Sequence, residues 1–177
     1  MNLDKVVACL KSIGFKPKIN EFQDRLIIQK MVYLLQLKGL KTNYRYNLYV
    51  RGPYSPQLTS EIYAHKNKLE RLELPATLSL NESKAINSFN ELFSELKPSI
   101  LEIAATYSFF AFGSAPQDAL TALKNVKKMK PFYSQAQISI GVSKAKEFLF
   151  QPTEKELIEM KDEAKAWQNA SLQTMRG

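Results

Sequence analysis

The chain has 177 residues, of which 45% are hydrophobic and 24% are charged. This length and composition favour one folded domain with its own core and exclude a disordered chain. A single cysteine and a single histidine exclude a disulfide framework and a metal site of the usual Cys/His composition within one chain.

The N-terminal residues carry an early acid and an apolar run that Lys11 interrupts, which is not the pattern of a signal peptide. No stretch of the sequence approaches the ~18 apolar residues that a membrane span needs. Because Cys9 has no partner for a disulfide, a reducing compartment is also favoured. These features predict a cytoplasmic protein.

The net charge of +8 is unevenly spread along the chain. Residues 1–51 and 121–150 are rich in Lys and Arg, whereas residues 52–120 hold more acids than bases. Such asymmetry indicates a basic face for an acidic partner, either nucleic acid or an acidic protein. The alternative is an ordinary solvated surface.

The apolar periodicity of the N-terminal part predicts helices over residues 3–13 and 22–38, ended by Gly14 and Gly39. Residues 44–51 then alternate in polarity, which predicts a strand. Four side chains of this strand are expected on the core face: Tyr44, Tyr46, Leu48 and Val50. Tyr49 and Arg51 fall on the opposite face.

Gly52 and Pro53 are expected to end this strand, and Ser55 to cap a helix over residues 56–68 with Pro56 in its first turn. Residues 72–80 are the best candidate for a second strand, at an edge because Pro75 cannot donate to a ladder.

Apolar periodicity and the spacing of prolines predict helices in the rest of the chain, over residues 82–95, 98–112, 116–128, 134–148 and 153–170. The last is expected to be peripheral. The predicted fold is mainly α (α+β): one helical domain spanning residues 1–177, with a small two- or three-stranded antiparallel sheet and a winged-helix-like N-terminal part.

Residues that carry chemistry are sparse. Cys9 lies on the apolar face of the first helix, where a core residue is favoured over a nucleophile. His65 is expected to be solvated or to cap a helix. No phosphate-binding glycine loop and no nucleophilic serine motif occurs. We therefore predict no catalytic residue, no cofactor and no metal.

The helix before the predicted strand raises a separate question. It must be largely buried, and Lys30 projects from it among leucines, on the wrong side for a solvated charge. Such a lysine extends to solvent, pairs with an acid, or lines a polar pocket. The pocket interpretation predicts that Lys30 lies close to the turn at Gly52–Tyr54.

These two segments carry a recognisable pattern. A helix reading L-x-x-Q-K-x-x-Y-L-L precedes a strand that ends in G-P-Y-S-P-x-L. The matching residues are Leu26, Gln29, Lys30, Tyr33, Leu34, Leu35, Gly52, Pro53, Tyr54, Ser55, Pro56 and Leu58. In this pattern, which covers about residues 22–65, the chain resembles the Panacea or SocA-type family, including YwgA-like proteins.

The resemblance implies a small helical domain that acts as an antitoxin or proteolysis adaptor, in toxin–antitoxin, phage-defence or mobile-element systems. Such proteins hold another protein and do not turn over a substrate. In a related group of antitoxins an acidic surface is thought to imitate DNA. The net charge of +8 departs from that pattern and argues against DNA mimicry here.

Two functions are therefore carried forward. The first is a protein-binding module whose cognate partner, a toxin or effector, contacts aromatic and basic side chains around the Gly-Pro corner. These are Tyr49, Arg51, Tyr54, Lys30 and Arg45. The alternative is a nucleic-acid-binding regulator with a winged-helix-like arrangement.

The nucleic-acid alternative draws on a basic patch of four lysines: Lys124, Lys127, Lys128 and Lys130. The competing interpretation is a solvated helix end whose lysines complement the helix dipole.

Overall fold

The computed structural model describes residues 2–73, 76–151 and 154–174. This part of the chain is mainly helical with a small antiparallel sheet, so the predicted fold class is confirmed. The helices are α1 (Asn2–Ile13), α2 (Phe22–Leu37), α3 (Pro56–Ala64), α4 (Lys66–Glu70), α5 (Leu80–Phe93), α6 (Pro98–Phe112), α7 (Ala119–Met129), α8 (Gln135–Leu149) and α9 (Glu154–Thr174).

Side-chain caps start several of these helices at the positions that their sequences indicate. Ser55 caps α3 by accepting a hydrogen bond from the Leu58 amide, and Pro56 follows in the first turn. Ser79 and Ser134 start α5 and α8, each within a reciprocal capping box. The helix predicted over residues 56–68 is broken at His65, which ends α3 and begins α4.

The sheet is a hairpin of two short strands, β1 (Asn47–Tyr49) and β2 (Gly52–Tyr54), joined by a two-residue turn. The prediction that residues 72–80 form the second strand is wrong. Residues 76–79 have no regular secondary structure and Leu80 already begins α5, while Glu73 precedes two residues outside the described part. The winged-helix-like arrangement therefore lacks the strand on which its prediction depended.

Val50 lies in the turn of this hairpin and is 79% exposed, so its predicted place in the core is also wrong. The strand ends two residues earlier than the polarity pattern indicated because Tyr49 already pairs with Gly52. Gly52 has a φ of +85°, which a residue with a side chain adopts only with strain.

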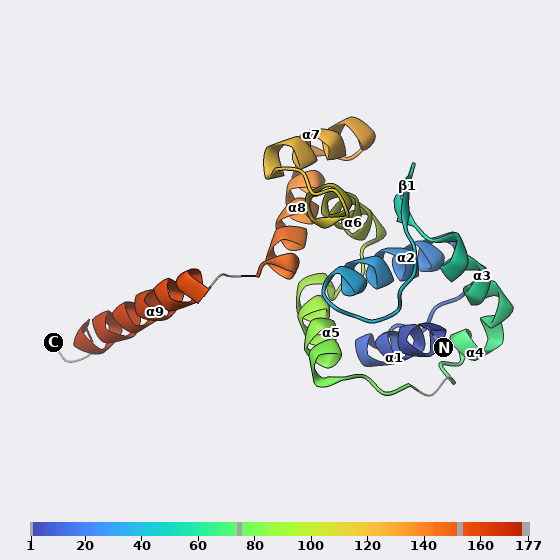
Figure 1. Cartoon of the computed structure of the whole chain (residues 1–177), viewed down its shortest axis with the longest axis horizontal. Coiled ribbons are helices and arrows are strands. Elements are labelled where there is room, and N and C mark those ends of the chain that lie inside the picture. Colours follow the sequence, from blue (N-terminus) through green and yellow to red (C-terminus); the bar gives the residue numbers. More distant parts are fainter. Residues whose placement is uncertain (1, 74–75, 152–153, 175–177) are drawn as a thin grey trace.

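The core lies around α2 and α6. Both helices have long buried stretches, and α6 packs against α2, α7, α8 and β2. Figure 1 shows α6, α7 and α8 grouped on one side of α2, with α1, α3 and α4 on the other. The hairpin is thereby placed beside both central helices.

Helix α9 extends away from this body (Figure 1). The side chains described in it are exposed, including Trp167 at 75%. None of the helices within the described ranges is both long and apolar enough to cross a membrane.

Candidate functional site

The segment that leads into and out of the hairpin is held by two glutamines of α2. The Gln29 side chain accepts from the Ser55 amide and donates to the Ser55 carbonyl, both at 3.0 Å. About two turns further along α2, the Gln36 side chain accepts a hydrogen bond from the Tyr44 amide and donates one to the Tyr44 carbonyl. Each glutamine thus satisfies the backbone of one residue much as a neighbouring strand would.

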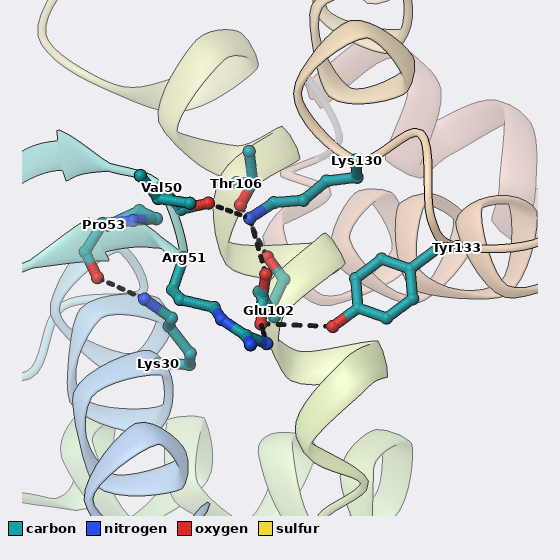
Figure 2. A network of polar contacts seen from close by, with 8 residues as sticks. All are labelled: Lys30, Val50, Arg51, Pro53, Glu102, Thr106, Lys130 and Tyr133. Carbon is teal, nitrogen blue, oxygen red and sulfur yellow. Dashed lines mark hydrogen bonds and ion pairs between the residues drawn. The ribbon is translucent and has the colours of Figure 1, made fainter. Parts of the chain in front are cut away.

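Lys30 holds the hairpin from the same helix. Its side chain is 2% exposed, and Nζ donates to the Pro53 carbonyl at 2.6 Å (Figure 2). Lys30 therefore lies against Gly52–Tyr54, as the pocket interpretation requires, although this segment is strand β2 and not a turn. A Cβ on Gly52 would stand 2.4 Å from Oγ1 of Thr106, so the close approach of α2, α6 and the hairpin also requires glycine there.

A second buried group lies on the other side of the hairpin. Glu102 of α6 is 1% exposed and accepts a hydrogen bond from Lys130 at 2.6 Å, and from the Tyr133 hydroxyl at 3.2 Å. Arg51 of the hairpin turn pairs with the same carboxylate at 3.4 Å. Lys130 also donates to the Val50 carbonyl at 2.6 Å, which ties the turn to α6 (Figure 2).

The network carries more positive than negative charge. Lys30, Arg51 and Lys130 surround the single carboxylate of Glu102. Burial, together with repulsion from the other two cations, lowers the pKa of Lys30 from 10.5 to about 7, although Glu102 opposes this. Burial and the neighbouring Glu102 raise the pKa of Tyr133 to about 12, so its hydroxyl remains a donor at neutral pH.

Next to Lys30 is an open groove of about 480 Å³ between α2, α3 and the hairpin, here called the hairpin groove. Its lining residues are Phe22, Arg25, Leu26, Gln29, Lys30, Tyr49, Val50, Arg51, Gly52, Tyr54, Thr59, Ile62 and Tyr63. This set combines aromatic and aliphatic side chains with three cations, and it contains no acid.

Cation–aromatic contacts define the rim of the groove. The Phe22 ring contacts both Arg25 and Arg51, with guanidinium-to-ring distances of 5.9 and 5.8 Å. Arg25 is also 5.7 Å from the ring of Tyr63. Across the groove, the rings of Tyr49 and Tyr54 meet edge to face at 5.3 Å. The rim is therefore built from side chains that already constrain one another.

The structure brings most of the predicted contact residues together. Tyr49, Arg51, Tyr54 and Lys30 all line the hairpin groove, whereas Arg45 is exposed and lies outside its lining. Of the predicted basic patch, three residues are exposed: Lys124, Lys127 and Lys128. The inclusion of Lys130 in that patch is wrong, because Lys130 is fully buried against Glu102.

Several important residues were not predicted. The groove is completed by Phe22 and Arg25 from the start of α2 and by Tyr63 from the end of α3. These two helix ends are distant in the sequence and only the fold brings them together. Glu102 had a signal in the sequence, since it is an acid within the apolar helix α6. Lys130 had no such signal in the sequence, because it follows the exposed lysines Lys124, Lys127 and Lys128.

A larger depression of about 610 Å³ lies near the C-terminal end of α8, but Lys146 is its only charged lining residue. Over the ranges that the structure describes, no group of three or more His, Cys, Asp or Glu side chains lies close enough to hold a metal ion. The hairpin groove is the better candidate site because a buried cation and aromatic side chains converge there.

The buried Glu102–Lys130 pair yields a stability prediction. Glu102→Gln should lower the free energy of unfolding by about 3 to 5 kcal/mol, because Lys130 would remain buried without its anion. Urea unfolding followed by circular dichroism measures this change. Glu95→Gln is the matched control, since Glu95 pairs with Lys97 on the surface and its loss should leave the midpoint nearly unchanged. Equal midpoints for both variants would contradict the buried network.

The lowered pKa of Lys30 predicts a pH dependence of stability. Between pH 7 and 8.5 the unfolded chain keeps the Lys30 proton and the folded chain loses it, so stability should rise with pH, by at most about 1.4 kcal/mol per pH unit. Lys30→Met should flatten this rise. Lys11→Met, which removes an exposed lysine, controls for the change in net charge. Parallel profiles for wild type and Lys30→Met would show that Lys30 does not titrate in this range.

Comparison with known proteins identified no relative: no family model matches the chain, no curated protein matches its sequence, and no solved structure matches its fold. The family resemblance of residues 22–65 therefore stays an expectation from the sequence.

Proposed function

We propose that this chain is a non-catalytic protein-binding module, of the antitoxin or adaptor kind, that holds a cognate protein partner in the hairpin groove. The observation that carries the proposal is the composition of the groove. Aromatic and arginine side chains anchor protein interfaces, and here they line one open depression with no acid among them.

Exposure supports the same proposal. Phe22, Tyr49 and Tyr63 are each about half-exposed, and Val50 at the hairpin tip is more so. Apolar side chains gathered in this way on one surface are typical of interaction sites. Because the cation–aromatic contacts hold the rim in place before binding, little conformational entropy would be lost on docking.

The resemblance of residues 22–65 to Panacea and SocA-type proteins supports a hypothesis about the kind of partner. We infer that the partner is a toxin or effector of a toxin–antitoxin, phage-defence or mobile-element system. In that setting the chain occupies a functional surface of the partner, and the cytoplasm is the compartment in which the two would meet. The protein encoded beside this chain is the first partner to test.

Nucleic-acid binding is the second candidate, favoured by the exposed Lys124, Lys127 and Lys128 of α7. The burial of Lys130 weakens it, since one of the four proposed phosphate contacts is committed to Glu102. Binding through phosphates weakens steeply with salt, so a mobility-shift assay at two salt concentrations separates the two functions.

The test of the proposed function removes two aromatic side chains from the groove rim. We expect Tyr49→Ala combined with Tyr63→Ala to preserve the fold, because both side chains are half-exposed, and to weaken the complex with the co-expressed neighbouring protein at least roughly tenfold. Co-purification and titration calorimetry give the affinity. Growth rescue from a toxic neighbour gives the cellular effect.

Phe150→Ala provides the matched control, because Phe150 is equally exposed but lies at the end of α8, outside the hairpin groove. It should bind the partner like wild type. A complex that forms equally well with the double variant, or that fails only with Phe150→Ala, would place the interface elsewhere.

A further inference from the structure

Lys30 is a buried cation without a carboxylate of its own. Among the described residues its Nζ has one hydrogen-bond acceptor, the Pro53 carbonyl, and no acid within ion-pair distance. A lysine ammonium has three donors, and buried charges are normally paired. The nearest acid in its network, Glu102, is already shared by Lys130, Arg51 and Tyr133.

The two arginines of the groove are partly committed elsewhere. Arg25 donates through Nη1 to the carbonyls of Ile19 and Asn20, and Arg51 pairs with Glu102. Of the three cations that line the groove, Lys30 has the fewest partners, since it donates to a single carbonyl and pairs with no carboxylate. One such cation matches a single negative charge, whereas a doubly charged phosphate is usually held by several converging guanidinium donors.

Apolar walls surround this cation. Leu26 and Ile62 line the groove together with the aromatic rim, and the depression is open to solvent. An occupant that fills the groove must therefore carry apolar groups beside its negative charge. A chain segment that crosses the groove fits this requirement, since successive side chains can contact the walls and the cation in turn.

We propose that the hairpin groove binds a segment of the partner protein in which an aspartate or glutamate is flanked by apolar side chains, with the carboxylate accepting a hydrogen bond from Nζ of Lys30. This inference rests on the proposed function and names the chemistry of the partner. Leu26, Ile62, Phe22 and Tyr63 contact the flanking side chains. Arg25 and Arg51 favour the same negative charge from the rim.

The titration of Lys30 adds a signature that can be measured. Three charged groups act on it electrostatically from α6, the end of α7 and the hairpin turn: Glu102, Lys130 and Arg51. The titratable groups that share the groove lining from α3 and the two strands are Tyr63, Tyr49 and Tyr54. Because the pKa of Lys30 is lowered to about 7, the free protein holds this charge at pH 6 and has largely lost it at pH 8.5. Carboxylate binding should weaken over this range.

The experiment uses the full chain and blocked pentapeptides of sequence Ala-Phe-X-Leu-Ala, with X as Glu, Gln or Lys. Titration calorimetry and NMR chemical shifts measure binding. We expect the Glu peptide to bind at least tenfold more tightly than the Gln peptide at pH 6, with the Lys peptide weaker still. The Glu preference should fall several-fold by pH 8.5. A fourth peptide that ends in a free Phe-Leu carboxylate tests whether a chain terminus is preferred.

Two variants locate the effect. Lys30→Met should abolish the Glu preference, while Arg45→Ala, which removes an exposed arginine outside the groove, should keep it. If Lys30→Met does not fold, the pH profile of the wild-type chain tests the assignment of Lys30 instead. Arg25→Gln, which removes a rim cation, should also reduce the preference for the Glu peptide.

Equal affinity for the Glu and Gln peptides, absence of binding by every peptide, or tighter binding of the free terminus would each overturn the proposal. These outcomes are separable from failure of the proposed function. If the peptides fail while the Tyr49 and Tyr63 double variant still loses its partner, the groove binds proteins without using a carboxylate. If neither test shows an effect, both proposals fail.

Discussion

The buried polar side chains of α2 are the constraint on which the rest of the site depends. Gln29 and Lys30 are buried and Gln36 is partly buried, so solvent cannot fully satisfy these side chains and each finds partners inside the protein. The segment from Tyr44 to Ser55, which contains the hairpin, supplies these partners through its backbone. The hairpin is too short to be stable on its own and is held in place from the side by these bonds.

This arrangement also determines the charge of the site. Three cations converge where the hairpin meets α2 and α6, and Glu102 neutralises only part of that charge. Arg51 has two roles, because it pairs with buried Glu102 and forms part of the groove rim. Burial lowers the pKa of Lys30, and repulsion from the other two cations adds to this effect.

The sequence was informative where local rules govern the structure. Gly39 marked a helix end and the Ser55–Pro56 pair a helix start, and the position of Lys30 on a buried helix left a polar pocket as one of three interpretations. Alternation of polarity located the strand region but not its end. The turn at Val50 depends on contacts of its carbonyl with Lys130, a residue 80 positions away.

The remaining parts of the site arise from packing between distant elements. Tyr63 and Phe22 become neighbours in the groove only because α3 folds back beside the start of α2. In the sequence Lys130 is indistinguishable from the solvated lysines before it, and only its contact with Glu102 of α6 shows that it is buried. Long-range pairs of this kind leave little local pattern, whereas an isolated acid in an apolar helix, such as Glu102, does.

Native-state hydrogen exchange tests the central claim that α2 side chains hold the hairpin. The amides of Tyr44 and Ser55 donate to the side chains of Gln36 and Gln29. If these bonds persist, both amides should exchange nearly as slowly as the core amides of α2, and Gln29→Ala should release Ser55 more than Tyr44. Exchange of both amides in the wild-type chain at the rate of an unstructured segment would contradict the account.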